Sequence, residues 1–130
     1  MAKSSPKKLI KKRLEKLAKT IAKTRDDFTC QWCGKRVEGC GAHGSHVVPV
    51  SADGRLAFDP INIKCLCFNC HMHQWHKHPI KASEWFVSKF PERWEYLKAE
   101  QLRNKARGTI LMTEYEEMEC ELKWIMEEMK

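Results

Sequence analysis

The sequence predicts an α+β protein that is mostly helical, with a small zinc-bound centre between helices at either end. Three observations support this prediction. Apolar residues recur at helical spacing near both termini and again after residue 80. Between residues 26 and 80 that spacing disappears, and cysteines and histidines become frequent. Two cysteine pairs with C-x2-C spacing, which is typical of zinc sites, lie in this middle region.

Residues 1–25 are expected to form a basic amphipathic helix. Ser5 is a suitable N-cap, and Pro6 suits the first helical position. The segment contains ten Lys and Arg residues against one Glu, a net charge of +9, which favours a polyanionic partner such as DNA. One stripe of this helix is apolar and consists of Ile10, Leu14, Leu17 and Ile21.

Residues 26–80 are expected to contain a β-hairpin followed by a helix. The segment SADGRLAFDP supplies turn residues between short apolar runs, HVVPV at 46–50 and RLAF at 55–58. The helix is expected to begin near Cys67. This region and the N-terminal helix together provide the side chains predicted to contact DNA: Lys7, Lys8, Lys11, Lys12, Arg13, Arg55, Lys64 and Lys77.

Residues 81–112 are expected to form a helical extension. The segments IKASEWFVSKF and PERWEYLKAEQLRNKA both show helical spacing, and Pro91 is placed to begin the second helix. Aromatic and aliphatic side chains at this spacing are more typical of packing than of base stacking. The expected core residues are Trp85, Phe86, Phe90, Trp94 and Leu97.

Residues 113–130 are expected to form an acidic helix with Thr113 as its cap. The segment has seven Glu residues against two Lys residues, a net charge of −5. Its opposite charge favours pairing with the basic helix, either within one chain or across a homodimer. A heptad-like seam on this helix consists of Tyr115, Met118, Leu122, Ile125 and Met129.

The cysteines predict a structural zinc site. Four thiolates from two C-x2-C knuckles, Cys30 with Cys33 and Cys67 with Cys70, form a closed tetrahedral site. A Cys2His2 finger in which Cys30 and Cys33 join His43 and His46 fits poorly. Nine residues precede His43 where about twelve are expected, and two residues separate the histidines where three to five are expected.

The remaining composition predicts a cytoplasmic protein of one domain with helical appendages. No apolar run approaches the roughly 20 residues of a membrane span, and no signal-peptide core follows the N-terminal lysines. In a reducing compartment, seven cysteines favour metal binding over disulfides.

Three further residues carry a resemblance to a known family. His46 lies in GSHVVP, Asn62 in DPINIKCLC, and His71 directly follows Cys70. Together with the two knuckles, this order of His, Asn and His resembles the HNH (His-Me finger, ββα-metal) endonucleases. The details are similar to phage recombination nucleases of the NinG type and to small phage HNH proteins, over residues 29–79. If the protein is phage-encoded, its compartment is the cytoplasm of the host cell.

The resemblance implies catalytic roles. His46 is expected to act as general base, Asn62 to brace the loop and orient the His46 ring, and His71 to bind a catalytic Mg²⁺ or Mn²⁺. The implied reaction is hydrolysis of DNA phosphodiester bonds, with 5′-phosphate and 3′-hydroxyl products.

One position departs from the family pattern. Many HNH proteins have Asp or His immediately before the general base as a second metal ligand, whereas this chain has Ser45. Ser45 or His43 is therefore the expected second ligand, and His76 is expected to assist. The departure favours an alternative, a non-catalytic zinc-containing module that binds nucleic acid without cutting it. A further alternative is an assembly protein in which the zinc unit is scaffolding.

Overall fold

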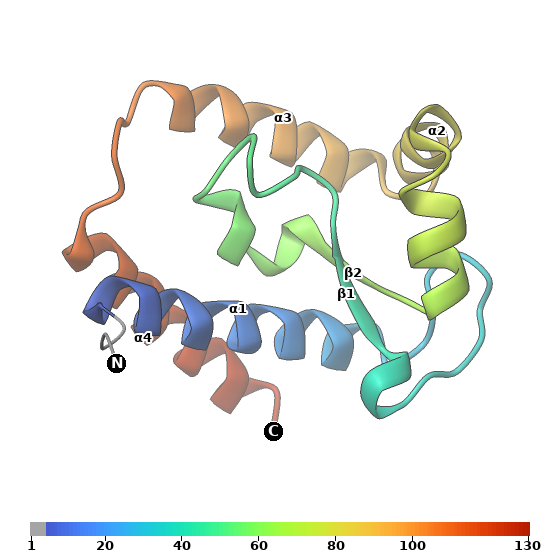
Figure 1. Cartoon of the computed structure of the whole chain (residues 1–130), viewed down its shortest axis with the longest axis horizontal. Helices are drawn as coiled ribbons and strands as arrows, with labels where there is room; N and C mark the ends of the chain where they lie inside the picture. The colour runs from blue at the N-terminus through green and yellow to red at the C-terminus, as the bar shows by residue number, and fades with distance from the viewer. Residues whose placement is uncertain (1–4) are drawn as a thin grey trace.

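A computed structural model describes residues 5–130 (Figure 1). The chain is mostly helical and contains one two-stranded antiparallel sheet. The helix α1 comprises Pro6–Arg25 and is followed by the strands β1, His43–His46, and β2, Ile63–Leu66. A helical turn with π geometry, Cys70–Trp75, follows β2. The three remaining helices are α2 (Pro79–Lys89), α3 (Pro91–Lys105) and α4 (Met112–Glu128).

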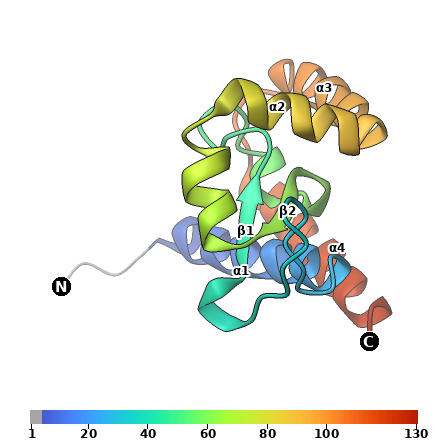
Figure 2. The same ribbon diagram turned by 90° about the vertical axis from the view of Figure 1, so that its right-hand side faces the viewer.

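The hairpin lies between two groups of helices. Figure 2 shows α1 and α4 on one side of the strands and α2 and α3 on the other. The strand β1 lies so close to α1 that a Cβ atom at Gly44 would be 2.7 Å from Cγ of Lys19. A larger residue at Gly44 would therefore require the Lys19 side chain or the strand to move.

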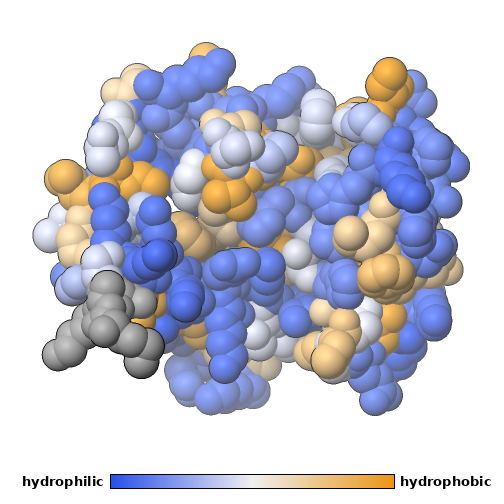
Figure 3. All heavy atoms as spheres, viewed as in Figure 1, coloured by the Kyte–Doolittle hydropathy of each residue, from blue (hydrophilic) through white to orange (hydrophobic). Residues whose placement is uncertain are grey.

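The predicted apolar stripe of α1 forms the first core. Ile10, Leu14 and Ile21 are buried, and they pack with Tyr115 and Leu122 of α4. The oxygen of Ser5 accepts a hydrogen bond from the backbone N–H of Lys8 at 3.2 Å, so the predicted N-cap is confirmed. The seams of the two terminal helices thus pair within one chain. The face seen in Figure 3 is mostly hydrophilic, including the region over α1.

The cap of α4 differs from the prediction. Leu111, not Thr113, occupies the N-cap position, and Thr113 lies in the first turn. The carboxylate of Glu114 accepts a hydrogen bond from the backbone N–H of Leu111 at 3.3 Å. The helix therefore begins without the predicted hydroxyl cap, and Glu114 binds the backbone N–H of the N-cap residue instead.

The hairpin strands also differ from the predicted runs. The strand β1 ends at His46, so the rest of the predicted run, residues 47–50, lies outside the sheet. Leu56–Phe58 form a 3-10 turn and not a strand. The carboxylate of Asp53 fixes this turn by accepting the backbone N–H groups of Arg55 and Leu56 at 2.9 and 3.1 Å. The segment Ile63–Leu66 pairs with β1 instead, with Ser45 opposite Lys64.

The second core joins α2 and α3 to the 3-10 turn. Phe86 and Leu97 are buried there beside Leu56, and the other predicted core residues, Trp85, Phe90 and Trp94, pack around them half-buried. No helix within residues 5–130 has the length and apolar character needed to cross a membrane.

Candidate functional site

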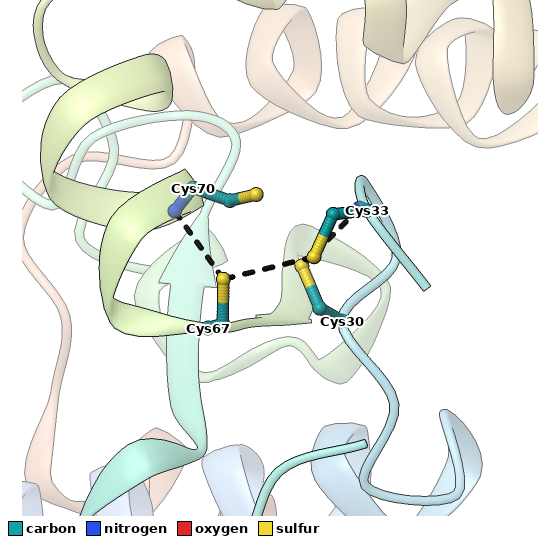
Figure 4. A group of neighbouring side chains, drawn as sticks. All are labelled: Cys30, Cys33, Cys67 and Cys70. Carbon is teal, nitrogen blue, oxygen red and sulfur yellow. Dashed lines mark hydrogen bonds between the residues drawn. The ribbon is translucent and has the colours of Figure 1, made fainter. Parts of the chain in front are cut away.

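The four knuckle cysteines converge on one point (Figure 4). Cys30 and Cys33 lie in the loop after α1, and Cys67 and Cys70 lie where β2 meets the helical turn. Their sulfur atoms are all within 4.8 Å of one another, and Sγ of Cys33 is 3.8 Å from Sγ of Cys67. A tetrahedral zinc site with Zn–S bonds of about 2.3 Å has S–S distances of about 3.8 Å. The cluster therefore fits a structural zinc ion.

Backbone N–H groups in each knuckle point at a sulfur atom. The N–H of Cys33 donates to Sγ of Cys30 at 3.5 Å, and the N–H of Cys70 donates to Sγ of Cys67 at 3.4 Å. These bonds stabilise thiolates, which are the form that binds zinc.

The thiols also differ in their ease of ionisation. Burial opposes ionisation of Cys30. Hydrogen bonds from the backbone N–H groups of Trp32, Cys33 and Cys67 outweigh the effect of burial, and the pKa of Cys30 falls to about 7. Burial, with the neighbouring thiols, raises the pKa of Cys70. One thiol thus ionises readily while another resists further negative charge. A dication compensates that charge, which is why this cluster suits a metal.

The first knuckle is fixed to the hairpin and to α2. The backbone N–H of Gln31 donates to the carbonyl of Cys65 at 2.9 Å, and the carboxylate of Asp26 accepts the N–H of Cys65 at 2.9 Å. The ring of Trp32 stacks on Trp85 of α2 at 4.4 Å between centroids. The cysteine cluster consequently connects three parts of the fold.

Three imidazoles form a chain in which His71, the residue after Cys70, is the middle member. Nδ1 of His43 lies 2.9 Å from Nδ1 of His71, and Nε2 of His71 lies 3.0 Å from Nε2 of His76. Burial, with smaller contributions from the His76 and His43 rings, lowers the pKa of His71 to about 4. The His71 ring is therefore neutral at pH 7, the form that binds a divalent cation. We call His43, His71 and His76 the histidine cluster.

Ser45 does not belong to the histidine cluster. Its side chain is fully buried, and its hydroxyl accepts a hydrogen bond from Nζ of Lys64 at 3.0 Å. The same Nζ lies 3.2 Å from the centroid of the Trp75 ring. The expected role of Ser45 as a metal ligand is wrong in this arrangement, because its hydroxyl is already bound by Nζ of Lys64.

The prediction that Lys64 contacts DNA is also wrong. The side chain is fully buried, between β1 and the helical turn. Burial, with repulsion from Arg93, lowers the pKa of Lys64 well below its ordinary value. The signal in the sequence is the position of Lys64 within the otherwise apolar strand Ile63–Leu66, which is buried along its whole length.

His46 lies at the end of β1, as predicted, but its side chain is on the face of the strand opposite to that of His43. Side chains alternate along a strand, so those of His43 and His46 leave opposite faces. Nε2 of His46 lies 2.9 Å from the carbonyl oxygen of Ala57. Burial, with repulsion from Lys19 of α1, lowers the pKa of His46, although the Ala57 carbonyl opposes the shift. The ring is therefore neutral at pH 7.

Asn62 braces the loop, as expected, but it does not bind the His46 ring directly. Its side-chain oxygen accepts the N–H of Val48 at 2.7 Å, and its amide donates to the carbonyls of Val48 and Leu56, each at 3.0 Å. These bonds fix the segment that presents the Ala57 carbonyl to His46. Because the Ala57 carbonyl is a backbone group, the residue types in the sequence could not predict that it contacts His46.

The remaining predicted DNA contacts divide into two sets. Arg55 is wrongly assigned, because its side chain is only 9% exposed and its guanidinium pairs with Glu114 of α4 at 2.8 Å. Arg13 is exposed but pairs with Glu119 of α4 at 2.7 Å. The predicted contacts that are exposed and lie outside the ion pairs with α4 are Lys7, Lys8, Lys11, Lys12 and Lys77.

Comparisons of this chain with protein-family models, with curated proteins and with solved structures found no match.

Proposed function

We propose that this protein is a zinc-stabilised, metal-dependent DNA endonuclease of the HNH type. The observation that carries the proposal is the histidine cluster, which lies directly beside the four-cysteine cluster. His71 follows Cys70 in the chain, so a zinc ion held by the cysteines would fix the helical turn that carries His71 and His76. The His71 ring, neutral at pH 7 and with a second imidazole close to each of its nitrogens, is a suitable ligand for a divalent cation.

The chain offers separate groups for proton transfer and for charge stabilisation. His46 is neutral at pH 7 and oriented by the Ala57 carbonyl, so it is suited to accept a proton from water. His71 would hold Mg²⁺ or Mn²⁺ through one ring nitrogen, together with His43 at Nδ1 or with His76 at Nε2. A bound divalent cation stabilises the charge that develops on a phosphodiester. Among residues 5–130, β1 pairs with β2 alone. Because His46 and His43 leave opposite faces of β1, the proposal requires the scissile phosphate to lie at the other edge of this strand, between the two groups.

The exposed lysines of α1 support DNA as the substrate. Lys8 and Lys12 point outward from a helix whose apolar stripe is buried against α4. Their charge attracts phosphates without regard to base sequence.

Cleavage assays test the proposal. The zinc-loaded protein is incubated with supercoiled, branched and single-stranded DNA, with Mg²⁺, with Mn²⁺ and with neither. We expect cleavage that requires the added cation. His71→Ala should need more cation for the same rate, while zinc content stays at one ion per chain. A parent protein that binds DNA but cuts none of these forms would reject the nuclease.

One observation favours a second function, the non-catalytic zinc-containing nucleic-acid-binding module. The residue before His46 is a buried serine that binds Nζ of Lys64, where many HNH proteins have a metal-binding Asp or His. This alternative predicts DNA binding that is unchanged by Mg²⁺ and by His71→Ala.

A further inference from the structure

Phe68 is an apolar side chain held at the surface beside the histidine cluster. It lies between the two cysteines of the second knuckle, and it is 57% exposed. Its ring contacts the rings of His43 and His73 edge to face, each at 5.8 Å between centroids. The neighbouring Cys67 and Cys70 fix the backbone on both sides when zinc is bound. The phenyl ring is therefore exposed and restrained at the same time.

A hollow of about 440 Å³ adjoins this ring. Phe68 and Asn69 line one part of it, and Lys35 and Arg36 from the first knuckle line another. Both basic side chains are exposed, and Arg36 pairs with the exposed Asp27 at 3.3 Å. Glu38 is the one acidic side chain of the lining. An apolar ring thus lies close to two cations, and it contacts His43 of the histidine cluster.

We propose that Phe68 is a stacking platform for an unpaired nucleobase, and that Lys35 and Arg36 bind the phosphates beside that base. Aromatic rings next to a basic groove are the usual means of binding single strands, because every base has an apolar face. A base within a duplex is already stacked on its neighbours and has no free face for Phe68. The inference rests on the proposed function and specifies its substrate class: DNA that is single-stranded, or contains unpaired bases, near the scissile phosphate.

The test measures binding in the absence of added Mg²⁺ or Mn²⁺, so that cleavage does not contribute. Fluorescence anisotropy of the zinc-loaded full chain is recorded with a labelled oligo-dT strand and with a blunt duplex of equal length. We expect Phe68→Leu, which keeps an apolar side chain but has no ring, to weaken single-strand binding by roughly 5-fold to 100-fold. Phe68→Trp should keep or increase that affinity. Duplex affinity should change little in either variant.

The matched control is Ile80→Ala. Ile80 is 78% exposed on the first turn of α2 and lies outside the lining of the hollow, so its removal tests the effect of losing any exposed apolar side chain. It should bind the single strand like the parent protein. Zinc content and far-UV circular dichroism of every variant should match the parent.

Several results would overturn the inference: a parent protein without affinity for the single strand, a Phe68→Leu variant that binds it normally, or equal losses on single strand and duplex. Failure of the stacking proposal can be distinguished from failure of the nuclease proposal. Normal cleavage without a Phe68 effect rejects the stacking platform alone. A Phe68 effect on binding without any cleavage rejects the nuclease alone.

Discussion

The His46 ring is held neutral by its surroundings, and this has a consequence for the pH dependence of cleavage. Burial and the nearby Lys19 lower the pKa of His46 from its ordinary value of 6.5. A general base acts when deprotonated, so the acidic limb of kcat/KM should lie below pH 6.5. His46→Ala should reduce cleavage by about 10² to 10⁴. Rates on supercoiled DNA between pH 4.5 and 8 provide the measurement.

Lys19 offers a graded control for this prediction. Lys19→Gln removes a positive charge that lowers the His46 pKa, so the acidic limb should move toward higher pH while the maximal rate is kept. A limb at the same pH in Lys19→Gln, or one above pH 6.5 in the parent, would contradict the assignment of His46 as the base.

Lys64 predicts an effect of pH on stability rather than on activity. Its pKa is lowered in the folded protein, so between that lowered value and 10.5 the unfolded chain binds more protons than the folded one. The free energy of unfolding therefore increases as pH rises from the lowered folded pKa of Lys64 toward 10.5. As pH falls back through the folded pKa, this increase is lost. Lys64→Met should lack this contribution.

Urea unfolding of the parent and of Lys64→Met at several pH values tests this. The free energy of unfolding of the parent should increase relative to that of the variant as pH approaches 10.5. The effects of other titrating groups cancel in this difference, because both proteins contain them. Parallel stabilities across the range would show that Nζ stays protonated, held by the Trp75 ring and the Ser45 hydroxyl.

Among the elements, the two knuckles and the helical turn depend on the predicted zinc. Structural zinc binding is coupled to folding, so Cys70→Ser should release the metal and unfold the segment that carries His71. Metal analysis should give one zinc per parent chain and less than one per variant chain, with a lower thermal midpoint. Cys120→Ser is the matched control, because Cys120 is exposed on α4 and far in sequence from the cluster. A well-folded parent without zinc would refute the site.

The helices and the cysteine cluster could be predicted because their signals are local. The stripe of α1 depends only on spacing, and two C-x2-C pairs in one small chain are typical of a metal site. The hairpin was harder, because strand pairing depends on contacts distant in sequence. The run at 55–58 looks like a strand, yet Asp53 folds it into a turn. Because the sequence placed β2 at 55–58, the burial of Lys64 could not be deduced. Because it placed β1 at 46–50, the opposite faces of His43 and His46 could not be deduced either.

Across the whole molecule, the charges are divided between the terminal helices that pair with each other. The apolar seams of α1 and α4 meet in the first core, and Arg13 pairs with Glu119 across their edge. Arg55 pairs with Glu114 and so connects the loop near His46 to α4. The acidic helix therefore neutralises one side of the basic helix, and the exposed lysines of α1 leave the other side positive. This arrangement directs the basic charge outward without a second chain.

That division predicts how salt affects DNA binding. Lys8 and Lys12 are exposed on α1, and their side chains lie outside the pairs with α4. Each phosphate contact contributes about 0.9 to the slope of log K against log salt concentration on duplex DNA. Changing both lysines to Gln should therefore flatten the slope by up to about 2. Lys123→Gln with Lys130→Gln removes the same charge from the acidic helix and should leave the slope nearly unchanged. Equal slopes in all three proteins would mean that DNA binds elsewhere, whereas equal flattening by both pairs would indicate an effect of net charge alone.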